Sequence, residues 1–282
     1  MIGPIVGSTL GGWITDSYSW RWVFLINVPV GTVCCITIFC AYLALYAATL
    51  SLNGLLESLF GYDALSAGLV MSPAGIFAVL AMPIVGRLLG LRMDARWLTA
   101  AGLLIVTSGN YWMSQLNLDI SPSQAVWPRV LVVLGLSVCF APANVAAYLY
   151  TPMALRGAAV GLLSLLRNEG GSVGVSLAQT FQERRDQFHT LRLGEYLDPF
   201  NAAAKAFLTQ AQSLFLQQTA DPVALQQLAW QQLENVRQQQ ASALAYFDCF
   251  WMVAVLTFAV AFLVLFMRRS VAEKGARMAQ SE

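Results

Sequence analysis

The sequence predicts an all-α fold, a polytopic bundle of membrane-spanning helices. Hydrophobic residues make up 57% of the 282-residue chain and charged residues only 11%, whereas a soluble domain carries about 25% charged residues. The mean hydropathy is +0.61. A net charge of +1 provides no basic surface for nucleic acid. We therefore expect membrane lipid, and no nucleic acid, around this chain.

Several apolar runs reach the length of about 20 residues that a bilayer-crossing helix needs. They cover 66–86, 98–116, 129–150, 157–181 and 246–267. Basic residues collect after the first and the last of these runs, at Arg87, Arg92 and Arg96 and at Arg268 and Arg269. Because basic loops stay in the cytoplasm, we expect residues 182–245 on the external side and the C-terminal tail inside.

The run at 22–56 contains no charge and does not fit this scheme. A single helix of that length would measure about 50 Å, which exceeds a hydrocarbon core of about 30 Å. Two short helices would fit, but no Gly, Asn or Pro marks a turn near residue 40. One tilted or interfacial helix is an alternative; we favour a junction between two incomplete helices.

Residues 182–245 form the long water-facing region and predict two amphipathic helices. Apolar residues recur at helical spacing from Phe207 to Phe215 and again from Leu225 to Ala229. Pro222 separates the two patterns. The two helices bury their apolar stripes either against each other, which we favour, or against a partner.

The first thirty residues carry the most specific motif. A glycine-proline string, in which Gly3, Gly7 and Gly11 share one helix face, is followed by an aromatic pair around an arginine and by an apolar run. The two groups are Gly3, Pro4, Gly7, Gly11 and Gly12, and Trp20, Arg21, Trp22 and Asn27. Small residues let a second helix approach closely, but such a face is common in membrane proteins. The whole string, GPIVGSTLGGWITDSYSWRWVFLINVPVG, resembles the antiporter motif of EmrB/QacA-type drug:proton antiporters, fourteen-helix members of the major facilitator superfamily.

The resemblance continues along almost the whole chain. Gly61-Tyr62-Asp63-Ala64 is similar to the external loop before the tenth helix of that family, and Arg167 to Gly174 to its thirteenth helix. A further stretch resembles a degenerate cytoplasmic loop motif through Gly86, Arg87, Asp94 and Arg96. In the superfamily these charges lock neighbouring helices together; a solvated loop that only orients the chain is the alternative here.

The resemblance implies a partial major facilitator fold, truncated and internally deleted. Residues up to about 40 match the fifth and sixth helices of the family, and residues from about 45 match the end of the ninth. We expect four parts: a remnant of the first half and linker, second-half spans, a large external helical loop, and the last span with its cytoplasmic tail. Their ranges are 1–59, 60–181, 182–245 and 246–282.

Three polar residues stand in the middle of the 157–181 run: Arg167, Asn168 and Glu169. Arg167 lies about 15 Å into such a helix, where a charge costs roughly 2.5–3.5 kcal/mol and should face a cavity or a partner. Arg167 and Glu169 are two residues apart and cannot pair on one face. They serve either proton coupling and substrate contact or a structural ion pair, the latter favoured for Glu169. Gly170 and Gly174 allow close helix packing.

The resemblance implies a secondary antiporter in the bacterial inner membrane, which exports hydrophobic, drug-like small molecules against a proton gradient. It implies no cofactor, and a periplasmic adaptor protein and an outer-membrane channel as partners. The alternative is a membrane remnant that does not transport. An enzyme is not expected, because an HExxH motif and a clustered acid pair are missing from the sequence. The five cysteines lack CxxC spacing, so we expect no metal site.

Overall fold

The computed structural model describes residues 20–90, 94–118, 122–149, 156–197, 201–216 and 221–265. All the regular elements in these ranges are helices: α2 (Trp20–Gly54), the π-helix η1 (Leu55–Leu59), α3 (Ala64–Gly90), α4 (Ala95–Ser114), α5 (Pro122–Leu149), α6 (Arg156–Glu195), α7 (Ala202–Phe215) and α8 (Pro222–Leu265). The predicted all-α membrane bundle is confirmed.

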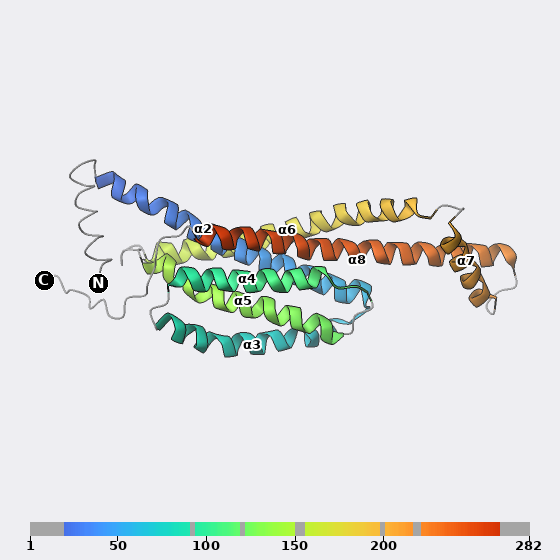
Figure 1. Cartoon of the computed structure of the whole chain (residues 1–282), viewed down its shortest axis with the longest axis horizontal. Coiled ribbons are helices and arrows are strands. Elements are labelled where there is room, and N and C mark those ends of the chain that lie inside the picture. Colours follow the sequence, from blue (N-terminus) through green and yellow to red (C-terminus); the bar gives the residue numbers. More distant parts are fainter. Residues whose placement is uncertain are drawn as a thin grey trace.

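Four of the described segments are long and apolar enough to cross a bilayer: Cys35–Leu59, Ala64–Leu88, Gln124–Pro142 and Pro222–Leu265. The chain is a multi-pass membrane protein. Its long helices lie side by side, with α2, α6 and α8 along one side of the bundle and α3 on the opposite side, against α5 (Figure 1). The outer face of α3 exposes large apolar side chains such as Leu69, Val79 and Ile84. This face suits contact with lipid.

Helices α4 and α5 cross closely, because glycines on both helices remove the side chains between them. A Cβ atom added to Gly102 would lie 2.7 Å from the carbonyl oxygen of Gly135. A Cβ atom on Gly135 would lie 2.6 Å from the carbonyl oxygen of Gly102. Val106 and Val132 are fully buried beside this crossing and pack with Ala41 of α2.

The charge-free run at 22–56 is continuous helix: it follows α2 from near its start to Gly54 and continues directly into the first residues of η1. Its two ends therefore lie at opposite ends of one rod, and the candidate membrane segment begins only at Cys35. The first part of α2 extends beyond the other described helices (Figure 1). The excess length is thus taken up by extension of the helix, without a second crossing.

The turn between η1 and α3 explains the Gly61-Tyr62-Asp63-Ala64 motif. Gly61 has a φ angle of +66°, a left-handed conformation that glycine adopts without a Cβ penalty. Asp63 then starts α3: its Oδ1 accepts from the Ser66 backbone N–H at 3.2 Å. Hydrogen bonding with Ser66 lowers the pKa of the Asp63 carboxyl.

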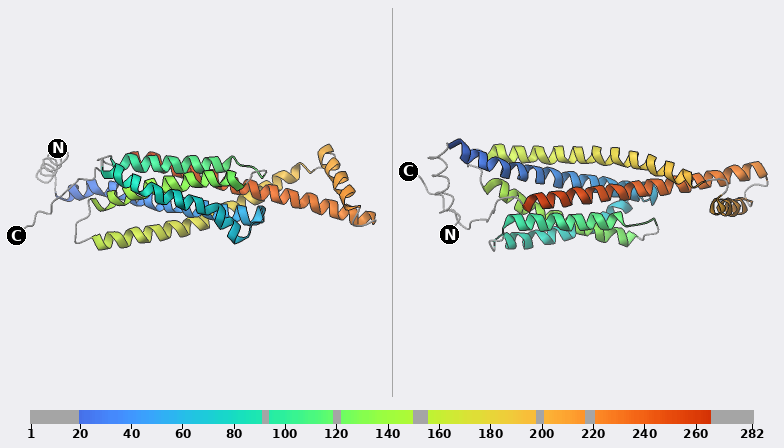
Figure 2. Two further views of the ribbon diagram at one scale, coloured as in Figure 1. Left: turned by 90° about the horizontal axis from the view of Figure 1, so that it is seen from below. Right: turned by 45° about the horizontal axis from the view of Figure 1, so that its top comes forward.

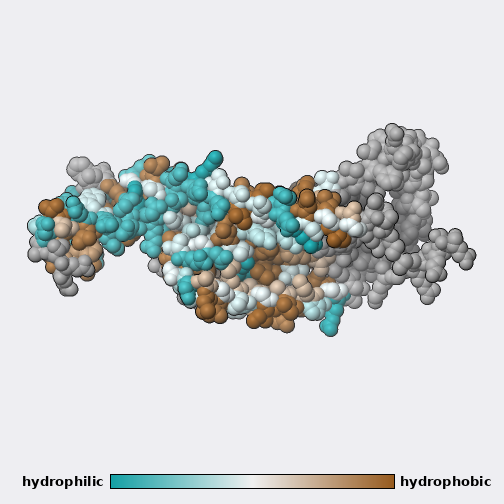
Figure 3. Space-filling view, turned by 180° about the vertical axis from the view of Figure 1, so that it is seen from behind, coloured by the Kyte–Doolittle hydropathy of each residue, from teal (hydrophilic) through white to brown (hydrophobic). Residues whose placement is uncertain are grey.

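Helices α6 and α8 continue well past the apolar runs and project together from one end of the bundle (Figure 2). Helix α7 packs against α8 at the far end, and Ala211, Leu225 and Ala229 are buried. The predicted amphipathic helices are both present and pack on each other; the second begins at Pro222 but runs without a break into the last span. Hydrophilic residues gather on this projection, at the left of Figure 3.

Candidate functional site

Helices α2 and α6 touch along a seam made of glycines. A Cβ atom on Gly170 would lie 2.5 Å from the carbonyl oxygen of Phe39, and one on Gly174 would lie 2.5 Å from that of Leu43. Non-bonded carbon and oxygen atoms do not approach so closely, so any side chain here would force the helices apart. The close packing predicted for Gly170 and Gly174 is confirmed.

Arg167 lies beside this seam and reaches across to α2. Its guanidinium carbon lies 5.6 Å from the centre of the Tyr42 ring, within the range of a cation–π contact. Tyr42 in turn stacks on Phe140 of α5, with 4.8 Å between the ring centres. Arg167 therefore contacts another helix, as the cost of a charge at this depth requires.

The opposite face of α6 carries a row of small or polar side chains that are all exposed. We call this row the α6 polar stripe: Ser164, Asn168, Ser172, Ser176 and Gln179. Steps of three and four residues place these side chains on one face of a helix. Glu169 is also exposed, next to the stripe. Sequence reasoning found Asn168 and Glu169 but not the three serines, because a lone serine is unremarkable in a membrane helix.

The stripe lies at bilayer depth, because α6 runs beside the apolar part of α2. Gly170 and Gly174 contact Phe39 and Leu43, which belong to the candidate span Cys35–Leu59. Ala178 lies in one buried cluster with Ala44 and Ala47 of α2. Exposed polar groups at such depth are tolerated where they face protein or a water-filled cavity.

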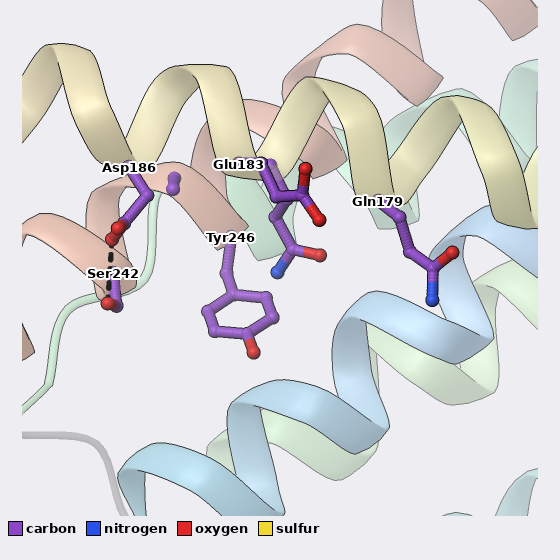
Figure 4. A pocket seen from close by; sticks show the side chains of 7 residues that line it. Gln179, Glu183, Asp186, Ser242 and Tyr246 are labelled. Carbon is purple, nitrogen blue, oxygen red and sulfur yellow. Dashed lines mark hydrogen bonds between the residues drawn. The ribbon is translucent and has the colours of Figure 1, made fainter.

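The stripe leads to an open pocket between α6 and α8 (Figure 4). The pocket has a volume of about 230 Å³ and is lined by Gln179, Gln182, Glu183, Asp186, Ser242, Ala245 and Tyr246. The carboxylate of Asp186 accepts from Ser242 Oγ at 2.7 Å and from Gln238 Nε2 at 3.2 Å. The ring of Tyr246 points away from these groups toward η1 (Figure 4), and its hydroxyl lies 3.2 Å from Ser58 Oγ.

A second carboxylate, that of Asp248 in α8, joins the same two helices through contacts with α6. Its Oδ2 lies 2.6 Å from Arg185 Nε and 2.6 Å from His189 Nε2. An ionised carboxylate only accepts hydrogen bonds, so both nitrogens donate. Sequence reasoning missed this cluster because its members lie about sixty residues apart. Periodicity within one segment carries no signal for such a pairing.

Sequence reasoning also missed Arg129, which is only 6% exposed between α2, α4 and α5. Its Nη2 donates to Thr49 Oγ1 at 2.8 Å, and its Nε and Nη1 have no hydrogen-bond partner. An arginine near the start of an apolar run reads as a flanking residue, so its burial could not be predicted.

The cytoplasmic loop motif lies at the facing ends of α3 and α4. Arg87 is in the last turn of α3, and both it and Gly86 are exposed. Asp94 is the N-cap residue of α4, and the Arg96 guanidinium lies 5.6 Å from the Trp97 ring centre. The charge lock stays a prediction.

The antiporter motif, Gly3, Pro4, Gly7, Gly11 and Gly12, lies outside the described residues. The aromatic-arginine hinge begins α2, but the side chains of Trp20, Arg21, Trp22 and Asn27 lie outside the described part. The roles of both motifs stay predictions.

This arrangement is suited to transient binding along a helix. The stripe offers hydroxyl and amide groups that exchange hydrogen bonds with water or a solute at little cost. One helix thus carries a tightly packed face, which anchors it to α2, and a polar face, which is open. Among the described residues, no three His, Cys, Asp or Glu side chains are grouped as metal ligands.

Comparison with known proteins assigns a family. The family model of the Major Facilitator Superfamily matches residues 35–175, half of the chain. The chain is similar to the multidrug export protein EmrB of Escherichia coli (strain K12), with 24% identity over 365 residues that cover 95% of this chain and 69% of EmrB. It is also similar to the fatty acid resistance protein FarB of Neisseria gonorrhoeae, with 23% identity over 72% of this chain and 58% of FarB.

The long alignments contain a large internal shortfall. The EmrB alignment extends over 365 positions, although 95% of this 282-residue chain is about 270 residues, so roughly 100 positions lack a counterpart here. The uncharacterized MFS-type transporter YhcA of Bacillus subtilis (strain 168) aligns at 28% identity over 152 residues, 54% of this chain and 28% of YhcA, without such a shortfall.

Proposed function

Because the chain belongs to the Major Facilitator Superfamily, a family of membrane transporters, we propose that it is the membrane component of a multidrug efflux transporter. In this role it exports hydrophobic, drug-like compounds from the bacterial cytoplasm across the inner membrane. The similarity to EmrB and FarB, named for multidrug export and fatty acid resistance, supports this assignment. It also favours a transporter component over an enzyme.

The α6 polar stripe is the observation that carries this proposal. Its five exposed polar side chains lie at the depth of the α2 span. Left against lipid, they would lack hydrogen-bond partners, which is costly. In a transporter they face the pathway between two helical bundles, where substrate sites lie near the midplane. The pocket at Glu183 and Asp186 then forms part of the external opening of that pathway.

The energy source in this proposal is the proton gradient, and no cofactor takes part. Asn168 lies in the middle of the stripe, Glu169 lies next to it, and Arg167 lies on the side of α6 that faces α2. These three residues are the candidates for coupling and for substrate contact. The projection made by α6, α7 and α8 is the candidate contact for a periplasmic adaptor protein, which hands substrates to an outer-membrane channel. Its length and hydrophilic surface (Figure 3) favour such a partner.

A second candidate function is a membrane remnant without transport activity. The shortfall of roughly 100 positions against EmrB favours it, because alternating access needs two helical bundles that rock about a shared site. A chain that has lost part of one bundle keeps its half of the pathway without the other. We therefore propose that the chain is an internally shortened piece, active only when the missing internal segments are supplied.

Ethidium efflux from energised cells tests both candidates. We expect no efflux above a vector control from cells that express residues 1–282 alone. A chimera in which residues 60–265 replace the matching part of Escherichia coli EmrB should export ethidium, and an uncoupler should abolish that export. Uncoupler-sensitive efflux by the chain alone would refute the shortened-piece proposal. A chimera that inserts in the membrane but exports nothing would favour the remnant.

A further inference from the structure

Arg129 has more hydrogen-bond donors than its surroundings satisfy. A guanidinium carries five N–H donors, of which one on Nη2 bonds to Thr49 Oγ1 at 2.8 Å. The Nε and Nη1 atoms, which carry three N–H groups, are buried and have no hydrogen-bond partner. The side chain as a whole is only 6% exposed.

Among the residues that the structure describes, none supplies Arg129 with an opposite charge. The ion pairs among the described residues involve Arg185, His189 and Arg237 rather than Arg129. The next layer of the bundle is apolar, with Val106, Val132 and Leu136 in one buried cluster. A buried cation without a partner is costly, so its retention here points to a group that binds it.

A buried acceptor lies at the same level. Asn110 of α4 is fully buried; its Nδ2 donates to the carbonyl oxygen of Val106 at 3.0 Å, and its Oδ1 has no partner. A Cβ atom on the preceding Gly109 would lie 2.9 Å from the carbonyl oxygen of Pro128. Asn110 and Arg129 therefore directly follow the two residues at which α4 and α5 cross. The free N–H groups of Arg129 match the oxygens of a carboxylate, which accept hydrogen bonds, and Asn110 supplies a second polar side chain at the same level.

Aromatic residues indicate how deep this point lies. Trp127, two residues before Arg129, is 57% exposed, and Trp112, two residues after Asn110, is 48% exposed. Exposed tryptophans collect at the level of the lipid headgroups. Arg129 and Asn110 thus lie just beneath that level. A molecule with its tail in the hydrocarbon would place its acid group there.

We propose that Arg129, Thr49 and Asn110 form a binding site for the acid group of an amphipathic carboxylate. The carboxylate oxygens accept from the free N–H groups of Arg129, while Thr49 holds Nη2 and orients the guanidinium. For the carboxylate to enter, α4 and α5 must separate at their crossing. The ligand therefore selects an open state of the bundle. This inference rests on the proposed function and names a substrate class for it.

Thermal unfolding of the purified full chain in detergent tests the site, with sodium octanoate as the probe. Octanamide and octylammonium, which have the same chain length, serve as the uncharged and the cationic control. A ligand that binds only the folded state raises the midpoint temperature in proportion to the logarithm of its concentration. We expect octanoate to raise the midpoint and the other two compounds to have no comparable effect.

Substitutions then test whether Arg129 is the residue that binds octanoate. Arg129→Met should fold, because an apolar side chain of similar length removes an unpaired buried charge, and should bind octanoate at least tenfold more weakly. Arg129→Lys keeps the charge without the planar fork and should also bind more weakly. Arg184→Met removes an exposed arginine and should bind octanoate as the unchanged chain does.

Two results would overturn the site: equal shifts with octanoate and octanamide, which would mean that the charged acid group contributes nothing to binding, or an unchanged octanoate response in Arg129→Met. The binding site and the proposed transport function can be refuted independently of each other. A chain that binds octanoate through Arg129, in a chimera that exports nothing, would keep the site and refute the proposed function.

Discussion

Gly174→Ala should drive α6 away from α2, and the structure gives the size of the effect. The new Cβ atom would lie 2.5 Å from the carbonyl oxygen of Leu43, against 3.4 Å for ordinary van der Waals contact. The helices must therefore separate by several tenths of an ångström along the seam. Such overpacking costs about 1–3 kcal/mol, part of which is offset by the better helix propensity of alanine, about 1 kcal/mol.

Gly161→Ala is the matched control, because it lies on the same helix and an added Cβ atom there meets open space. The assay is thermal unfolding of the two purified variants and the unchanged chain in the same detergent. We expect Gly161→Ala to leave the midpoint equal or higher, and Gly174→Ala to unfold about 2–12 °C below Gly161→Ala, because both variants gain the alanine propensity and only Gly174→Ala is overpacked. Equal midpoints for the two variants would refute the tight seam. Gly170→Ala should behave like Gly174→Ala.

Three other predictions concern charge and orientation. Asp248→Asn should lower the unfolding free energy by about 1 kcal/mol, because it weakens hydrogen bonds from two partly exposed partners; a midpoint equal to that of Glu195→Gln would count against this. In a chain without its native cysteines, Gln218→Cys should react with an impermeant thiol reagent in intact cells, and Ser281→Cys only after permeabilisation. Labelling in the opposite order would reverse the orientation. Arg167→Ala in the EmrB chimera should insert normally but lose ethidium export; normal export would leave Arg167 a structural or dispensable role.

Features that depend on neighbours along one helix could be predicted from the sequence. The apolar runs predicted the bundle, the spacing of Gly170 and Gly174 predicted the seam, and Pro222 predicted the start of α8. Each of these follows from a local rule: hydrophobic length, the missing side chain of glycine, or the preference of proline for the first turn of a helix.

Features that depend on packing between distant segments could not be predicted. Arg129 becomes a site candidate only because α2 and α4 bury it. Asp248 is significant only because α6 brings Arg185 and His189 beside it. The continuation of α6 to Glu195 and of α8 across its whole length left no signal either, since a helix can pass from lipid into water without a break.

Helix α6 connects these observations, because its two faces have different requirements. The glycine face must stay free of side chains to lie against α2, whereas the stripe must meet water or polar groups. The two faces lie on opposite sides of one helix at the same depth. A third side of α6, with Val173 and Leu177, is apolar and exposed. Comparing the stripe with this third side distinguishes a water-facing surface from a lipid-facing one.

Cysteine accessibility along α6 therefore tests the central claim most directly. In the full chain without native cysteines, Asn168→Cys and Ser172→Cys introduce thiols on the stripe. Val173→Cys and Leu177→Cys introduce them on an exposed apolar side at similar depth. A charged, membrane-impermeant thiol reagent reacts with the thiolate and needs water to reach it. The account predicts that the two stripe positions react in membranes and the two apolar positions do not. Equal reaction at all four positions, or reaction at Val173 and Leu177 alone, would contradict it.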